Sequence, residues 1–241
     1  MTVFFLVITK SSTFKNKSIC TPFIERDKSS LIPMRSYTLL LFLVLFVSTV
    51  FAQNPNYKMG ERALINGDFK AAVSSLEKAL AADSNDVNTL YMLGYSYYHA
   101  SNYTKAVTTF GRVISLKPAE NSAYYYRGKA RNIMANDTKG ISNPDREKLL
   151  LLSIRDFSKA IELNSDDVKL YQNRAVAYRD YGVLKGQKIP NFYDKNKAVN
   201  AFKSCISDFE KVLSLTPGRK DITNQLADAR AYMKNLNWIL Q

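Results

Sequence analysis

A repeat of 34 residues constrains this chain more than any other feature of its sequence. Gly60, Gly94 and Gly128 follow one another at intervals of 34 positions. The residues around the first two glycines recur with them at the same interval. Gly60, Gly67, Asp68, Phe69, Ala72, Leu76 and Ala79 precede Gly94, Ser101, Asn102, Tyr103, Ala106, Phe110 and Val113 in this way. A fixed period of this length is typical of solenoids, in which each repeat is one supersecondary unit that stacks on its neighbours.

The repeat over 87–120 has the pattern of two amphipathic helices joined by a short turn. Its apolar and small residues recur every three to four positions, which predicts one buried stripe on each helix. Ser101 and Asn102 interrupt the pattern, and Pro118 ends the second helix because it lacks a backbone N–H. The two stripes are Leu90, Leu93, Gly94 and Tyr97, then Ala106, Phe110, Val113 and Ile114.

This pattern resembles the tetratricopeptide repeat, closely in 87–120 and more loosely elsewhere. The resemblance implies an all-α solenoid of helical hairpins with a C-terminal capping helix, and a role in binding other proteins. The residues that carry it are Leu90, Leu93, Gly94, Tyr97, Ala106, Phe110, Val113 and Pro118.

Two of the four predicted repeats are longer than the others. Gly128 and its counterpart Ala175 are 47 positions apart, so we predict an insert in the third repeat and another in the fourth. Both fall between the two helices of a hairpin, and such loops emerge on one edge of a solenoid. The repeats are placed at about 53–86, 87–120, 121–167 with insert 135–147, and 168–218 with insert 182–199, followed by a capping helix over 220–240.

The amino-terminal part has the pattern of an export signal. An apolar run over 38–47 follows Arg35 and leads to small residues ending at Ala52. We expect 34–52 to be a signal peptide cleaved after Ala52, which predicts a secreted or periplasmic protein. We interpret 1–33 as an upstream extension absent from the natural protein, with translation starting at Met34. The alternative is an uncleaved membrane anchor, but its ~15 apolar residues are fewer than the ~20 of a spanning helix.

The composition disfavours catalysis, metal binding and nucleic-acid recognition. His99 is the only histidine, which excludes sites with several His ligands and leaves His-based catalysis to one residue. Cys205 stands where the repeat has alanine, so we predict a packed thiol. The net charge is +13, but lysines and arginines are spread without a long run, unlike a nucleic-acid-binding patch. We predict no cofactor, no metal and no enzymatic activity.

Tyrosine is the residue type from which a binding site is predicted. The chain holds 15 tyrosines, many of them on two successive first helices. The family resemblance implies a concave groove lined by residues of the first helices, and rings beside amides and cations suit an extended peptide. Alternatively, the rings pack only on one another. The predicted groove comprises Tyr57, Tyr91, Tyr95, Tyr98, Tyr125, Tyr126, Lys129, Asn132, Lys169, Gln172, Asn173 and Arg179.

The predicted function is an exported scaffold that binds a peptide or protein noncovalently in this groove. Family members that grip a carboxyl-terminal acid use lysine, asparagine and arginine where this chain has Tyr57, Glu61, Met92, Ser122 and Tyr126, so that clamp is not expected. One alternative is binding of an anionic envelope polymer by the lysine-bearing inserts. Another is a homo-oligomeric subunit whose groove is filled by a second copy or by its own inserts. A membrane is predicted as a partner only through an uncleaved signal segment.

Overall fold

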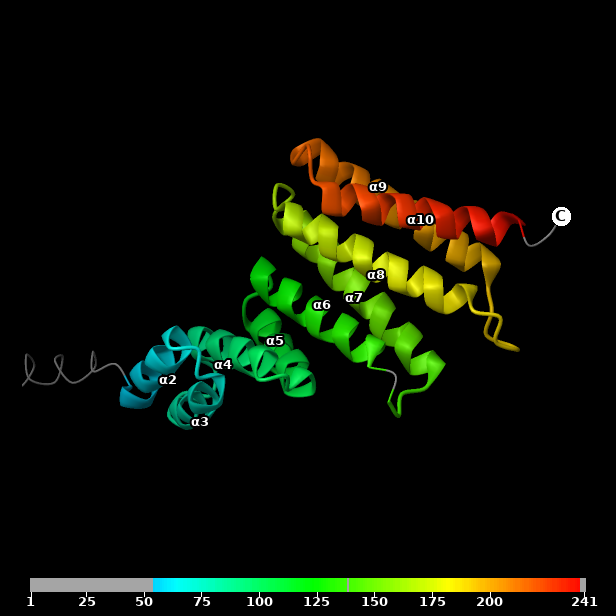
Figure 1. Ribbon diagram of the computed structural model, residues 1–241. Coiled ribbons are helices and arrows are strands. Elements are labelled where there is room, and N and C mark those ends of the chain that lie inside the picture. Colours follow the sequence, from blue (N-terminus) through cyan, green and yellow to red (C-terminus); the bar gives the residue numbers. More distant parts are fainter. Residues whose placement is uncertain (1–53, 138, 239–241) are drawn as a thin grey trace, which may run out of the picture. The chain divides into compact units, whose positions relative to one another are not determined.

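The computed structural model describes residues 54–137 and 139–238. The predicted signal peptide, the upstream extension and the last residues of the predicted capping helix lie outside these ranges. Within them the chain forms nine α-helices and no strand (Figure 1). The helices are α2 (Pro55–Ile65), α3 (Phe69–Leu80), α4 (Val87–His99), α5 (Tyr103–Leu116), α6 (Asn121–Asn136), α7 (Asn143–Leu163), α8 (Val168–Gly186), α9 (Lys195–Leu215) and α10 (Lys220–Trp238).

Consecutive helices pack in pairs as hairpins. The pairs are α2 with α3, α4 with α5, α6 with α7, and α8 with α9. Each hairpin also contacts the next, because α3 packs on α4, α5 on α6 and α7 on α8. The final helix, α10, packs against α9. The prediction of an all-α solenoid is confirmed.

The turn between the two helices explains why the sequence repeats there. Asp68 begins α3 by accepting a hydrogen bond from the backbone N–H of Ala71 at 3.0 Å. Asn102 does the same for α5 from the N–H of Lys105, at 3.3 Å. The residue before each cap is left-handed, with φ +73° at Gly67 and +60° at Ser101. Side-chain oxygens at such positions satisfy N–H groups that a helix start leaves unpaired.

The glycine of each early hairpin lets its two helices approach closely. A Cβ atom added to Gly94 would lie 3.0 Å from Cε1 of Phe110, and one added to Gly60 would lie 2.5 Å from Cγ of Leu76. Any larger residue would therefore force the facing side chain to shift. The partners of these glycines are fully buried, as are Phe157 and Phe209 of the later hairpins. The core thus repeats with the sequence.

Most residues of the two predicted inserts extend helices. In the described ranges, the loop residues that remain between the helices are 137, 139–142 and 187–194. The added helical turns continue the apolar stripe, since Leu150 on α7 and Leu184 on α8 are fully buried. Longer helices bury more apolar surface, which is the main favourable term in folding.

The two extended segments contact each other through a buried lysine. The Nζ atom of Lys185 lies 3.3 Å from Oε2 of Glu147 and 3.8 Å from the ring centroid of Phe192. The hydroxyl of Tyr181 donates to Oε1 of Glu147 at 3.1 Å. Lys185 is only 4% exposed, and a buried charge is costly unless it is paired. The carboxylate of Glu147 compensates the charge of Lys185 inside the protein.

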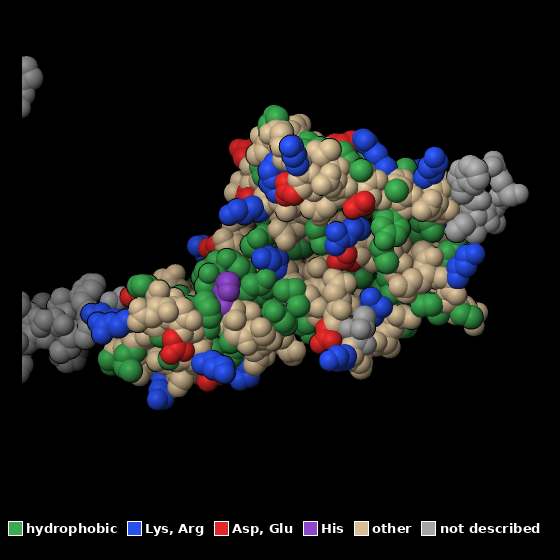
Figure 2. All heavy atoms as spheres, in the orientation of Figure 1, with side chains coloured by type: hydrophobic (Ala, Val, Ile, Leu, Met, Phe, Trp, Pro, Cys, Tyr) green, Lys and Arg blue, Asp and Glu red, His purple; other side chains and the backbone are tan. Residues whose placement is uncertain are grey.

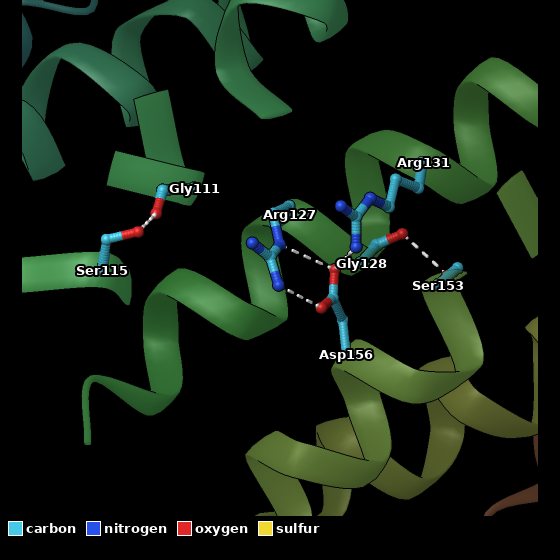
Figure 3. Close-up of polar contacts among 7 residues, drawn as sticks. All are labelled: Gly111, Ser115, Arg127, Gly128, Arg131, Ser153 and Asp156. Carbon is cyan, nitrogen blue, oxygen red and sulfur yellow. Dashed lines mark hydrogen bonds and ion pairs between the residues drawn. The ribbon is translucent and has the colours of Figure 1, made fainter. Parts of the chain in front are cut away.

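The third and fourth hairpins are each joined internally by an Arg–Asp pair, and Figure 3 shows the pair of the third hairpin. Arg127 on α6 donates from Nε and Nη2 to the carboxylate of Asp156 on α7, at 3.0 and 2.7 Å. Arg131 adds a third bond to the same carboxylate at 2.6 Å. Arg174 and Asp208 repeat the two-bond geometry between α8 and α9, at 2.8 Å for each bond.

Candidate functional site

The first helices of the four hairpins contact one another directly. Helix α4 contacts both α2 and α6, and α6 contacts α8. All twelve residues of the predicted groove belong to these four helices. The predicted site therefore extends along this row of helices, from α2 to α8.

Tyr126 on α6 is the centre of a cluster of aromatic rings. Its ring stacks on Phe110 at 5.7 Å between centroids and meets the edges of Tyr95 at 5.2 Å and Tyr98 at 5.4 Å. Tyr91 and Tyr125 also contact it, at 6.5 and 5.1 Å. Edge-to-face and offset contacts at these distances are favourable. Burial, followed by the neighbouring phenols, raises the pKa of Tyr126, so its hydroxyl is protonated.

Two nitrogen-bearing side chains border this aromatic cluster. The Nζ atom of Lys129 lies 5.3 Å from the ring centroid of Tyr98 and 5.4 Å from that of Tyr125. His99 stacks on Phe69 at 4.7 Å and lies 4.3 Å from Tyr95. Figure 2 shows hydrophobic side chains, tyrosines included, gathered around the histidine. Five predicted tyrosines and Lys129 thus form one continuous surface whose rings are half-buried against each other.

An open cleft lies beside the cluster, where α2 and α4 meet the start of α6. It encloses about 400 Å³, and two of the predicted tyrosines reach it. A second cleft of about 310 Å³ shares Tyr57 and Asn88 with the first and also reaches Asp83 and Asp86. The first cleft is lined by Tyr57, Val87, Asn88, Tyr91, Met92, Glu120 and Ser122.

Two of the predicted polar residues, Asn132 on α6 and Arg179 on α8, belong to a separate cluster around Asp180. The amide of Asn132 donates to Oδ2 of Asp180 at 3.1 Å, and the guanidinium of Arg179 donates to Oδ1 at 3.0 and 3.2 Å. Asn136 adds a bond to Oδ2 at 2.7 Å. Asp180 and Asn136 were not predicted. Asn136 follows Asn132 by four positions on the same helix face, a spacing that could have indicated it.

The remaining predicted residues lie at the start of α8. Lys169 is exposed, and its carbonyl oxygen accepts a bond from the amide of Asn173 at 2.7 Å. Gln172 accepts a bond from Arg219 at 3.4 Å. The side chain of Asn173 is thus held by its own helix and that of Gln172 by the turn before α10, and no interaction in the described ranges links these residues to the tyrosine cluster.

Comparison with known proteins identifies the architecture. The tetratricopeptide repeat (TPR) family model matches residues 57–121 and 91–132. The crystal structure of MamA is similar over 74% of this chain and 92% of its own, with 23% identity and a TM-score of 0.52. The fold is a TPR solenoid. A thermophilic TPR protein of Thermus thermophilus is 16% identical over 73% of this chain and 97% of its own, with a TM-score of 0.45. No curated protein sequence matches the chain.

Within this TPR solenoid, Cys205 and His99 lie in different environments. Cys205 is fully buried in the core of the last hairpin, and burial raises the pKa of its thiol to about 12. A protonated buried thiol is a poor nucleophile. His99 is exposed at the end of α4 among aromatic rings. Between residues 54 and 238, position 138 excepted, no three His, Cys, Asp or Glu side chains are grouped as metal ligands require.

In the same part of the chain, no helix is both long enough and apolar enough to span a membrane.

Proposed function

We propose that this TPR protein is a noncovalent scaffold that binds an extended segment of a partner protein along α2, α4 and α6. The observation that carries the proposal is the pair of clefts that share Tyr57 and Asn88. A groove with rigid rings, an amide and an open end offers contact area and hydrogen bonds to a peptide backbone.

The tyrosine cluster would act as the wall of this site. Most of its rings already contact one another, so little side-chain freedom is lost when a ligand packs against them. Tyr57 and Tyr91 reach the cleft, whereas Tyr126 is enclosed by its neighbours. We therefore assign direct ligand contact to Tyr57, Asn88 and Tyr91, and support of their positions to the rings behind them.

The charges of the clefts favour an internal or cationic segment over a carboxyl terminus. The charged residues that line them are Glu120, Asp83 and Asp86, and none is a lysine or arginine. Glu120 is paired with Lys117 at 2.7 Å, but Asp83 and Asp86 form no ion pair within the described ranges and would repel a free carboxylate. This agrees with the expectation that a carboxylate clamp is not formed here.

The alternative of a polymer-binding surface on the lysine-bearing inserts has less support. Lys185 is buried against Glu147, and Lys197 lies 3.5 Å from Asp194 and 4.0 Å from Glu147. Their charges are thus compensated within the protein. The proposal also includes export after cleavage at Ala52 and no catalytic role, and the buried thiol of Cys205 supports the latter.

Selection of binding peptides from a random display library, followed by fluorescence anisotropy, tests the proposal. The substitutions Tyr57→Ala and Asn88→Ala together should weaken the selected peptides about tenfold or more, because both remove direct contacts. Tyr232→Ala, an exposed tyrosine on α10, is the matched control and should leave affinity unchanged. Equal loss in both variants, or no enrichment of peptides by the native protein, would contradict the proposed groove.

A further inference from the structure

Arg127 on α6 and Arg174 on α8 occupy equivalent positions in successive hairpins. One guanidinium nitrogen, Nη1, is hydrogen-bonded in Arg174 but not in Arg127 within the described ranges. Arg174 donates from Nε and Nη2 to Asp208, and its Nη1 donates to the hydroxyl of Ser158 at 3.1 Å. Arg127 makes the same two bonds to Asp156, but its Nη1 makes no hydrogen bond to any residue that the structure describes.

The difference comes from one residue on the preceding helix. Ser158 follows the buried Phe157, and the residue that follows the equivalent Phe110 is Gly111. A Cβ atom added to Gly111 would lie 3.8 Å from Nη1 of Arg127. A serine at this place could reach the nitrogen, as Ser158 does, but glycine leaves it open.

The open nitrogen borders a cleft of about 500 Å³ between α5 and α6. In Figure 3 the Gly111–Ser115 turn of α5 lies on one side of the Arg127 guanidinium and Asp156 on the other. Both charged residues in the lining are arginines. The lining residues are Asn85, Thr108, Gly111, Arg112, Ser115, Leu116 and Arg127.

The arginines at this cleft outnumber the carboxylates that pair with them. Asp156 is shared by Arg127 and Arg131, so one carboxylate faces two guanidinium groups. Arg112 donates to the carbonyl of Ser84 and forms no ion pair within 4 Å in 54–137 or 139–238. Asp83 and Asp86 line the neighbouring cleft and not this one, and Asp86 caps α4 by accepting from the N–H of Thr89 at 3.0 Å. The lining of this cleft therefore presents two arginines and no carboxylate to an anion.

We propose that this cleft binds a phosphate group. Arg112 on α5 and Arg127 on α6 approach from different helices, so their donors fit an anion with several oxygens better than a flat carboxylate. A phosphate monoester carries nearly two negative charges and three strong acceptor oxygens, which matches two guanidiniums. The amide of Asn85 supplies a further donor. The lining of this cleft shares no residue with the two clefts of the proposed peptide groove.

Isothermal titration calorimetry at low ionic strength tests the proposal with two probes. Inorganic phosphate tests the anion site alone, and a short phosphoserine peptide with its unphosphorylated counterpart tests a phosphorylated protein as the source. Phosphate should bind with saturable heat, and the phosphopeptide at least about tenfold more tightly than the serine peptide. If inorganic phosphate binds but the two peptides do not differ, the site takes free phosphate only. Absence of saturable heat with both phosphate-bearing probes would overturn the proposal.

Three substitutions distinguish phosphate binding in this cleft from general attraction to a positively charged protein. Gly111→Ser should occupy Nη1 of Arg127 as Ser158 occupies Arg174, and should weaken phosphate binding about fivefold without changing net charge. Arg112→Gln should weaken it by a similar factor. Lys203→Gln, an exposed lysine on α9, removes the same charge elsewhere and should have an effect within about twofold. Equal weakening by Arg112→Gln and Lys203→Gln, with no effect of Gly111→Ser, would show that the cleft is not the site.

Discussion

Arg127 and Asp156 are joined side-on by two parallel hydrogen bonds, and the pair is nearly enclosed by the protein. The carboxylate side chain is 3% exposed and the guanidinium side chain 17%. Two-bond Arg–carboxylate pairs combine charge with fixed geometry. In the second hairpin the equivalent positions are Leu93 and Thr109, which are buried and carry no charge. In this TPR solenoid, the two helices of the second hairpin are therefore held at this layer without an ion pair, and those of the third by one.

Removing the carboxylate of Asp156 should destabilise the protein strongly. Asp156→Asn leaves Arg127 and Arg131 partly buried without a counter-charge, and breaking such a buried pair costs about 3–5 kcal/mol. The free energy of unfolding from urea titration measures the loss. Asp208→Asn, which leaves the single guanidinium of Arg174, should cost less. Equal losses of unfolding free energy in the two variants would indicate that leaving Arg131 without its carboxylate adds no further cost.

Copying the second hairpin into the third should recover much of that loss. The triple variant Arg127→Leu, Arg131→Tyr and Asp156→Thr reproduces Leu93, Tyr97 and Thr109 at their equivalent positions. Replacing a buried ionic group by well-packed residues is often neutral or stabilising. We expect the triple variant to be more stable than Asp156→Asn by about 2 kcal/mol or more, measured by the same urea titration. A triple variant no more stable than the single one would mean that the two hairpins are not equivalent at this layer.

Two glycine substitutions should change stability in opposite directions. Gly60→Ala places a Cβ 2.5 Å from a fully buried Leu76, and overpacking of this kind costs about 1–3 kcal/mol. Gly111→Ala also lies inside a helix, but its Cβ meets no heavy atom closer than 3.8 Å. It should stabilise the protein by about 0.5–1 kcal/mol, because glycine loses more backbone entropy in a helix than alanine. Thermal unfolding followed by circular dichroism compares the two.

The features that the sequence predicted well are those that recur at the repeat period. The glycines, the helix caps and the apolar stripes each have a local physical cause, so the hairpins and their order followed from Gly60, Gly94 and Gly128. The helix lengths in the third and fourth hairpins could not be predicted in this way, because whether a polar segment continues a helix depends on what its apolar residues contact. Leu184 shows this, since its burial is a tertiary effect.

The candidate site was predicted in part for the same reason. Position within a first helix was enough to place the tyrosines on one row of helices. It could not tell which rings would reach a cleft, as Tyr57 does, and which would be enclosed, as Tyr126 is. The Arg–Asp pairs were missed, although Asp precedes the core phenylalanine in both Asp156–Phe157 and Asp208–Phe209, a recurrence that could have indicated them.

Replacing Tyr126 should distinguish the supporting rings from those that contact a ligand. Tyr126→Ala removes a half-buried ring in contact with Tyr91, Tyr95 and Tyr98, and should destabilise the protein by about 1–3 kcal/mol. Tyr57→Ala should cost less than about 1 kcal/mol, because this ring borders open clefts. Urea titrations of both variants provide the measurement. The reverse order of losses would show that Tyr57, not Tyr126, is the structural ring.

The single histidine should titrate below its ordinary value, and folding stability should fall as it becomes charged. Partial burial, with the charge of Lys129 as a second cause, lowers the pKa of His99 from its ordinary value of 6.5. The folded state therefore binds the proton less readily than the unfolded chain, so stability is lost as pH falls through 6.5 and is unaffected by His99 above it. Because the chain has one histidine, its ring resonances in NMR spectra report this pKa directly. Lys129→Gln should raise the midpoint but leave it below 6.5, since burial is the larger cause. A midpoint at or above 6.5 in the native protein would mean that His99 is more solvated than its contacts with Phe69 and Tyr95 imply.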